Sequence, residues 1–284
     1  MSEQDDLDGS SATVHVPATT IDGWYDGYIL DLDGTIYLGD QLLPGAAETI
    51  GTLHRHGIPR IYLSNNPTRD RRMYVDKLRG FGLPVEPAEV ITTVFTTTQW
   101  ILQNAPDAVV YPIAEEPLVR SLGDAGIAMS DDPRRIDIVI ASYDRDLHWR
   151  KLQIAFEAIW YYKRAYMIAT NPDLFCPFPE GQGEVDAGAV IAAIEAVTRT
   201  KLAVNCGKPS PVMLETIARA MGFDLKRCLV TGDRLYTEIR MGIDAGIDTA
   251  LVLTGETAPD AVGAIDERDA PTYVIPSIGE LLPK

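Results

Sequence analysis

The tetrapeptide Asp-Leu-Asp-Gly occurs twice in this 284-residue chain, and the sequence around the two copies differs. The second copy begins at Asp31, directly after the apolar run 28–30, which is typical of a buried strand in a parallel sheet. Asp31 and Asp33 are therefore expected at the carboxyl end of that strand, where open α/β sheets place their ligand sites. Two carboxylates this close can divide the work of a reaction, because one can be ionised while the other is held protonated. The first copy, at 6–9, lies in a polar segment and is interpreted as solvated acidic chain.

Three further strand ends carry polar groups of chemical interest. In a parallel sheet the carboxyl ends of the strands meet at one edge, so these groups are expected to share a crevice with the first aspartates. Each tip alone also fits an ordinary turn, a helix cap or a solvated lysine, but four tips in one chain favour a common site. The three tips besides Asp31 and Asp33 are Ser64-Asn65-Asn66, Gly207-Lys208 and Gly232-Asp233.

Strand-like and helix-like segments alternate with short links on both sides of a long central region. This pattern predicts βαβ units and a doubly wound, Rossmann-like parallel sheet. Besides 28–30, strands are expected within 58–67, 227–234 and 248–255, and helices within 44–57, 69–82 and 236–246.

The central region has its own alternation and is expected to form a second α/β unit inserted into the first. Strands are expected within 107–114, 135–144 and 165–171, and helices within 115–126, 149–164 and 186–199. The predicted division is a flexible extension at 1–20, a discontinuous core at 21–87 and 203–284, and the inserted unit at 88–202.

Composition narrows the possible functions. The formal net charge of −16 argues against general nucleic-acid binding. Three scattered cysteines give neither a disulfide framework nor a zinc knuckle. The N-terminus lacks the features of a signal peptide, and no apolar run reaches membrane-spanning length, so a cytoplasmic protein without a membrane partner is expected.

The segments "DLDGT", "LSNN", "GKPSP" and "GDRLYTEI" resemble, in that order, the four motifs of the haloacid dehalogenase (HAD) superfamily. The stretches "GTIYLGDQLLPGA", "SNNPTR" and "ATNPD" are more closely similar to its NagD-like subfamily. The resemblance implies a Rossmann-like core whose insert is a C2-type cap. It also implies a phosphatase that hydrolyses a small phosphorylated metabolite with the help of Mg²⁺.

The resemblance also implies roles for the core residues. Asp31 would attack phosphorus to give an aspartyl-phosphate, and Asp33 would protonate the leaving oxygen and later deprotonate water. Mg²⁺ would be held by the Asp31 carboxylate, the Asp33 backbone carbonyl and Asp233. Lys208 would offset the charge of the nucleophile and of the phosphoryl oxygens.

Phosphate would be bound by Ser64 and by the backbone N–H groups of Asn65 and Asn66. One position departs from the usual motif, because Glu238 stands where many members carry aspartate. Glutamate reaches one methylene further and is expected outside the first shell of the metal. Arg234 and Tyr236, in the same motif, have no explanation from the sequence.

In the insert, Asn171 and Asp173 follow a predicted strand and are candidates for contact with substrate, although a plain turn explains them equally well. The aromatic cluster 160–162 lies in a predicted helix and fits the core or a subunit interface better than a substrate stack. NagD-like proteins often pair through the cap, so a homodimer is expected.

Two other functions remain open at this stage. A phosphotransferase or phosphomutase would use the same aspartyl-phosphate but pass it to a second substrate instead of water. A non-catalytic protein could keep the fold to bind a phosphorylated metabolite. Metal-dependent release of free phosphate separates the hydrolase from both.

Overall fold

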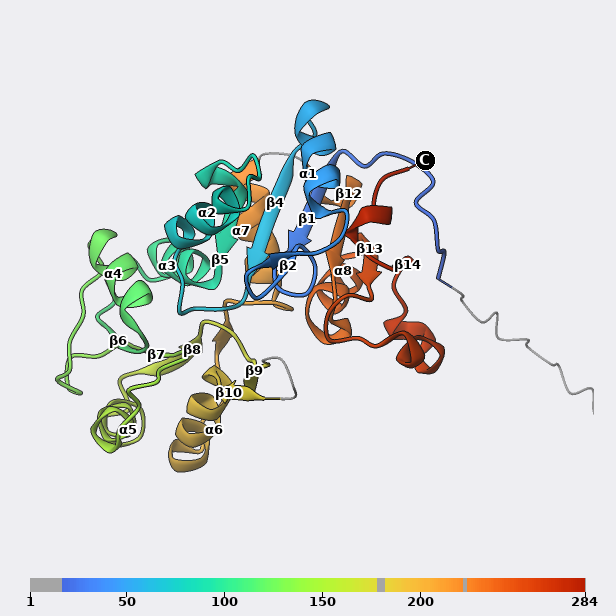
Figure 1. Cartoon of the computed structure of the whole chain (residues 1–284). Coiled ribbons are helices and arrows are strands. Elements are labelled where there is room, and N and C mark those ends of the chain that lie inside the picture. The colour runs from blue at the N-terminus through green and yellow to red at the C-terminus, as the bar shows by residue number, and fades with distance from the viewer. Residues whose placement is uncertain (1–16, 178–181, 222–223, 284) are drawn as a thin grey trace, which may run out of the picture.

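The computed structural model describes residues 17–177, 182–221 and 224–283. It contains a six-stranded and a four-stranded sheet, each packed with helices, and Figure 1 shows the smaller sheet below the larger one. Most of the expected extension, with its Asp-Leu-Asp-Gly copy, lies outside the described residues. The last residues of the extension, from 17 on, are described and are held against the larger sheet. The Ala18 N–H donates to the Thr272 carbonyl, and the Ala18 carbonyl accepts from Val274 N–H.

The larger sheet has the strand order β14-β13-β12-β1-β4-β5, and all of its neighbouring strands are parallel. Along the chain, β4 and β5 are added on one side of β1, and β12, β13 and β14 are added later on its other side. Strand order therefore reverses between β1 and β12, and a crevice is expected outside their carboxyl ends. The strands are β1 (Gly27–Asp31), β4 (Arg60–Ser64), β5 (Val90–Thr92), β12 (Cys228–Gly232), β13 (Asp248–Val252) and β14 (Tyr273–Ile275).

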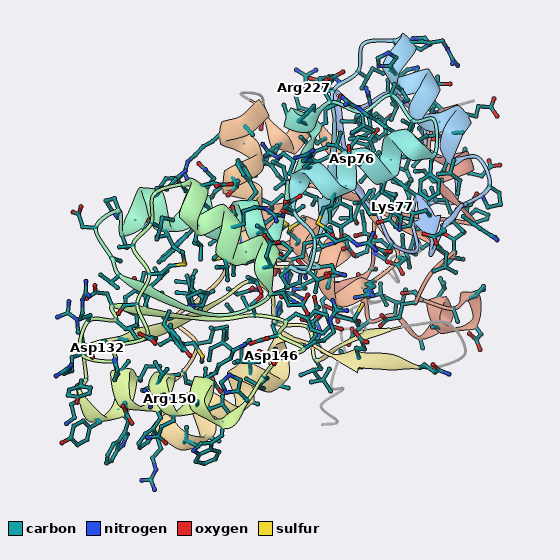
Figure 2. The ribbon with its side chains drawn as sticks, turned by 60° about the vertical axis from the view of Figure 1, so that its left-hand side comes forward. Asp76, Lys77, Asp132, Asp146, Arg150 and Arg227 are labelled. Atoms are coloured by element: carbon teal, nitrogen blue, oxygen red, sulfur yellow. The ribbon has the colours of Figure 1, made fainter. Side chains whose placement is uncertain are left out.

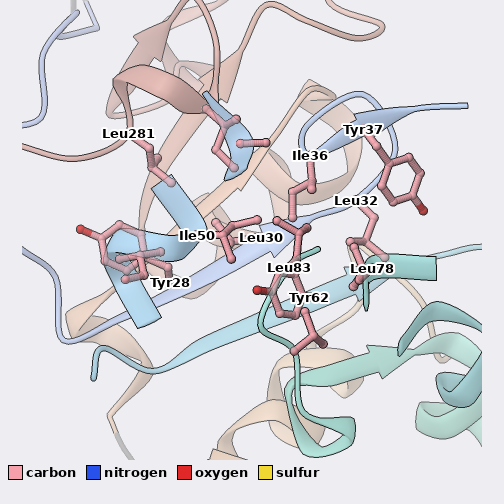
Figure 3. Close-up of a cluster of buried hydrophobic side chains, with 14 of the residues drawn as sticks. Tyr28, Leu30, Leu32, Ile36, Tyr37, Ile50, Tyr62, Leu78, Leu83 and Leu281 are labelled. Atoms are coloured by element: carbon pink, nitrogen blue, oxygen red, sulfur yellow. The ribbon is translucent and has the colours of Figure 1, made fainter. Parts of the chain in front are cut away.

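Both faces of β1 are buried, which explains its uninterrupted apolar sequence. Successive side chains point to opposite faces, so Tyr28 and Leu30 join the cluster drawn in Figure 3, whereas Ile29 joins another. The first cluster includes side chains of the first two helices, and the second includes those of the last two. These helices are α1 (Ala46–Arg55), α2 (Arg71–Gly80), α7 (Pro211–Met221) and α8 (Arg240–Ala245).

The smaller sheet has the order β11-β8-β7-β6 and is also parallel. Side chains of α3 and α4 pack with one face of it, and those of α5 and α6 with the other. Its strands are β6 (Val110–Ile113), β7 (Ile138–Ala141), β8 (Tyr166–Ala169) and β11 (Val204–Asn205). The helices are α3 (Thr93–Asn104), α4 (Glu116–Asp124), α5 (Trp149–Phe156) and α6 (Ala187–Thr198). Antiparallel pairs join β2 (Tyr37–Leu38) to β3 (Gln41–Leu42) and β9 (Phe175–Pro177) to β10 (Gly183–Val185).

The α/β class with a parallel, Rossmann-like sheet, predicted from the sequence, is confirmed. Sheet membership crosses the expected division at both ends of the insert. Strand β5 lies within 88–202 but pairs with β4, and β11 lies within 203–284 but pairs with β8. The helix expected at 149–164 ends at Phe156 and continues as a π-helical turn, Glu157–Tyr161. Among the described residues, no helix combines the length and the apolar character that crossing a membrane requires.

Candidate active site

Asp31 is the last residue of β1 and is 6% exposed. Its two carboxylate oxygens have different partners. Lys208 Nζ lies 2.6 Å from Oδ1, and the Thr35 hydroxyl donates to Oδ2 over 3.2 Å. The carboxylate is therefore fixed at the carboxyl end of a central strand, directly at the point where strand order reverses.

Lys208 is almost completely buried, and its ammonium group lies between two carboxylates. Besides Asp31 it forms an ion pair with Glu238 Oε1. Glu238 is itself buried in a π-helical turn, Leu235–Ile239, and its Oε2 accepts from the Thr237 hydroxyl over 2.6 Å. π-helical turns of this kind are frequent at functional sites.

Burial and charge oppose one another in this cluster. Burial raises the pKa of Asp31 well above its usual range, and Lys208 only partly offsets this, while Glu238 and Asp233 raise it further. Burial also acts to raise the pKa of Glu238, but the charge and hydrogen bond of Lys208 outweigh it and hold that pKa low. Burial acts to lower the pKa of Lys208, but its two carboxylates raise it. The lysine is therefore a fixed positive charge.

Asp233 follows β12 directly and is 3% exposed. Its Oδ2 accepts from the Glu256 backbone N–H over 2.7 Å, whereas its buried Oδ1 has no hydrogen-bond partner among the described residues. Burial and the charge of Glu238 raise the pKa of Asp233 to about 6. Two glycines leave room for this carboxylate, because a Cβ would lie 2.5 Å from Oδ2 at Gly34 and 1.9 Å from it at Gly255.

The donor groups fit a divalent cation such as Mg²⁺. Lys208 pairs with the two buried carboxylates of Asp31 and Glu238. The buried Asp233 Oδ1 is an oxygen acceptor without a donor among the described residues. Within 17–177, 182–221 and 224–283, no three His, Cys, Asp or Glu side chains form a metal cluster. Mg²⁺ takes one or two protein carboxylates and keeps several waters.

Asp33 differs from Asp31 in its surroundings. It is exposed, and its Oδ2 accepts a hydrogen bond of 3.1 Å from the Tyr37 hydroxyl. The turn that carries it needs Gly34, whose φ is +84°, and the Gly34 N–H donates to the Tyr37 carbonyl. Asp33 thus has contact with solvent, whereas Asp31 is closed off from it.

The tip of β4 is held by side chains. Ser64 Oγ shares a hydrogen bond of 2.6 Å with the Tyr74 hydroxyl and accepts one of 3.2 Å from Asn66 N–H. Asn65 joins distant parts of the chain, because its Nδ2 donates to Asp173 over 2.9 Å and its Oδ1 accepts from Lys208 N–H over 2.8 Å. The structure therefore brings the serine and lysine tips together with the insert.

The two candidates in the insert have different environments. Asn171 is completely buried and donates to Asp173 and Asp186, each over 3.0 Å. Asp173 is partly exposed and lies against Asn65 of the larger sheet. Of the pair, Asp173 alone has surface that a ligand can touch.

A group of residues that the sequence left unexplained supports Asp233. Arg234 Nε lies 3.0 Å from Glu256 Oε2, and the Tyr236 hydroxyl donates to Glu256 Oε1 over 2.7 Å. Glu256 in turn binds Asp233 through its backbone N–H. Glu256 was missed in the sequence, although it follows Gly255 just after a strand, which is the same signal that marked the other tips.

Comparisons with known proteins agree with this geometry. Residues 28–128 match a family described as haloacid dehalogenase-like hydrolase, and 205–281 match a HAD-hydrolase-like family. The 5'-nucleotidase YutF of Bacillus subtilis is 33% identical over 91% of this chain and 98% of its own length. An acid sugar phosphatase of Staphylococcus haemolyticus is 33% identical over 88% of this chain and 92% of its own.

Solved structures give the same result. A 4-nitrophenylphosphatase of Thermotoga maritima is 34% identical, covers 90% of this chain with 96% of its own, and has a TM-score of 0.84. The chain belongs to the haloacid dehalogenase-like hydrolases. The narrower resemblance to the NagD-like subfamily is also confirmed, since a structure described as a putative nagD protein is 33% identical, with a TM-score of 0.80 and 89% and 96% coverage.

Proposed function

We propose that this protein is a cation-dependent phosphatase that hydrolyses small phosphate monoesters through an aspartyl-phosphate on Asp31. The observation that carries the proposal is the pairing of Asp31 with the buried Lys208 beside the unpartnered oxygen of Asp233. The names of the relatives support it, because they are a nucleotidase, an acid sugar phosphatase and nitrophenyl phosphatases.

The proposed reaction has two steps. Asp31 forms a bond to phosphorus as the bond to the leaving oxygen breaks, and Asp33 gives that oxygen a proton. Asp33 then takes a proton from water, which attacks phosphorus and releases phosphate and the free Asp31 carboxylate. The contrast between a closed Asp31 and an exposed Asp33 suits these roles, since only the second must exchange protons with solvent.

The cation would be held by the Asp31 and Asp233 carboxylates and the Asp33 backbone carbonyl. When bound it supplies positive charge against the carboxylate and phosphoryl oxygens, and Mg²⁺ fits the oxygen donors. Lys208 contributes a second, permanent charge at the same carboxylate. Glu238 pairs with that lysine and would lie outside the metal's first shell.

We assign phosphate binding to Ser64, with the backbone N–H groups of Asn65 and Asn66. The four-stranded sheet and its helices, from α3 to β11, would serve as the cap that contacts the leaving group. Asp173 is the proposed substrate contact of this cap, and Asn171 positions it, because Asn171 has no exposed surface.

The wider setting follows from these assignments. The substrate class is small phosphorylated metabolites, and the cap would select among nucleotides, sugar phosphates and similar esters. We also propose a cytoplasmic enzyme that forms a homodimer through the cap. The aromatic side chains of α5 and the turn after it support this, since Trp160 is 50% and Tyr161 65% exposed, so the core interpretation of this cluster is wrong.

The test is phosphate release from p-nitrophenyl phosphate with and without Mg²⁺. Wild type should need the metal, and Asp31→Asn should lose activity while Asp260→Asn, which changes an exposed carboxylate, should keep it. Asp31→Asn should also yield no acid-stable phosphoprotein in a rapid quench, where wild type yields one. Release of p-nitrophenol without free phosphate, in the presence of an alcohol acceptor, would instead favour the phosphotransferase. Binding of the ester without release of p-nitrophenol would favour the non-catalytic protein.

A further inference from the structure

A second pocket lies away from the aspartates, between helices of the two sheets. Its volume is 480 Å³, within the range of small-molecule sites. Residues of α2 form one wall, and Pro117, Arg120 and Ser121 of α4 form the opposite one. None of its lining residues belongs to the catalytic cluster.

The pocket is positive in a chain that is strongly negative. Four arginines and three aspartates line it, whereas the whole chain carries a net charge of −16. Two of these arginines are already used. Arg120 pairs with Asp70 over 2.5 Å and so connects α4 to the start of α2, and Arg79 pairs with Glu86 over 3.4 Å. Arg72 is exposed and has no ion pair in the described part of the chain.

Arg71 is the residue that turns the pocket into a candidate site. Its Nε donates to the Val90 carbonyl over 2.7 Å, and its guanidinium lies 3.7 Å from the centre of the Phe95 ring. These contacts fix the plane of the group and leave the N–H groups of Nη1 and Nη2 without an acceptor among the described residues. A guanidinium held in this way can bind an oxyanion with little further ordering.

The charge of Arg71 is not compensated by the protein. The residue is half-buried, no carboxylate forms an ion pair with it in the described ranges, and burial lowers its pKa. A partly desolvated cation without a counter-ion is costly, so an anion in the pocket would recover free energy. Val75, Phe95 and Pro117 add apolar surface beside it.

We propose that this pocket binds a small organic anion, with its oxyanion on Arg71 and its apolar part against Val75 and Pro117. Helix α2 packs against the larger sheet and α4 against the smaller one, so one ligand would contact the helical layers of both sheets. Figure 2 shows Asp76 on the α2 side of the molecule and Arg150 far from it on α5, so Arg150 provides a distant control.

The test is calorimetric titration of the full chain with benzoate and benzenesulfonate, and with benzamide as the uncharged counterpart. The two anions should bind saturably with a Kd of roughly millimolar size, as expected for ligands of so few atoms. Arg71→Gln should weaken them at least tenfold, while Arg150→Gln should not. Asp31→Asn should bind them as wild type does, so the outcome is independent of the proposed phosphatase.

Two further measurements cover loss of folding and misplaced binding. Ser121→Phe fills the pocket from α4 and keeps Arg71, so it should abolish binding while the thermal unfolding midpoint shows a folded protein. A crystal soaked with benzenesulfonate should show the sulfonate on Arg71. The proposal is overturned if neither anion binds, if Arg71→Gln binds equally well, or if the probe is found elsewhere.

Discussion

Glu238 shows how one methylene group changes a buried ion pair. Its carboxylate reaches Lys208, so the lysine lies between two acids instead of facing Asp31 alone. Gly232 makes this possible, since a Cβ there would lie 2.5 Å from Glu238 Cγ. The extra length that looked like a departure from the usual motif therefore holds the lysine against the proposed nucleophile.

Shortening this side chain should slow the reaction. Glu238→Asp withdraws the carboxylate from Lys208, and kcat with p-nitrophenyl phosphate is expected to fall about 10- to 100-fold, the usual cost of disturbing a group that orients a site. Glu215→Asp, at an exposed ion pair of α7, is the matched control and should keep full activity. Equal kcat for Glu238→Asp and wild type would show that Lys208 needs no second carboxylate.

Arg234 should act on the metal through Glu256. Arg234→Gln removes the contact that orients Glu256, whose backbone N–H holds Asp233. The Mg²⁺ concentration at half-maximal activity is therefore expected to rise about tenfold or more, with less change in kcat at saturating metal. Arg240→Gln, which removes exposed ion pairs on α8, should leave the Mg²⁺ titration unchanged. A fall in kcat alone would mean that Arg234 acts on substrate instead.

At the scale of elements, the start of α6 carries a buried charge. Asp186 caps this helix by accepting from Ala187 N–H, and burial raises its pKa to about 6. The folded chain therefore binds the proton of the Asp186 carboxyl group more tightly than the unfolded chain, in which the pKa of this group is near 3.8. Stability is highest while the group is protonated and falls as pH rises between these two values.

This pH dependence can be isolated with one variant. Between pH 5 and pH 7.5 the free energy of unfolding of wild type should fall by about 1 kcal/mol more than that of Asp186→Asn, which has no proton to lose. Urea unfolding at the two pH values measures the difference, and the other carboxylates cancel in it. Parallel changes in both proteins would show that Asp186 is ionised at pH 5.

The elements also show where sequence reasoning succeeded and failed. Strand tips were predictable, because a short apolar run before a polar residue is a strong local signal. Helix α3 was not predicted, since Thr96, Thr97 and Thr98 disfavour a helix. In the structure they are buried, and the hydroxyls of Thr96 and Thr98 donate to the carbonyls four residues before, so packing overrides propensity.

At the scale of the whole molecule, contacts between distant segments escaped the sequence. Asn65 was predicted to bind phosphate through its backbone, but its side chain also joins Lys208 and Asp173, which are 143 and 108 residues away. No local pattern reports such a pairing. The core aspartates and the lysine were found because each occupies the end of a strand, whereas the contact of the insert with them depends on how two sheets meet.

Several aromatic side chains of the smaller sheet's helical layer are exposed. Trp149 is 79% exposed, Trp160 50% and Tyr161 65%, and Trp160 stacks on Phe156 with ring centres 5.2 Å apart. Exposed aromatic side chains are enriched in interaction surfaces. This is the surface through which the proposed homodimer would form.

A single charge should separate that dimer. Trp160→Glu replaces one of these exposed aromatic side chains by a carboxylate, which pairing would bury without a partner at a cost of several kcal/mol. Light scattering after gel filtration should give twice the chain mass for wild type and the chain mass for the variant. Trp24→Glu adds the same charge at another exposed tryptophan and should remain dimeric. A monomeric wild type would contradict the proposal, and an unchanged dimer in Trp160→Glu would place the interface on another surface.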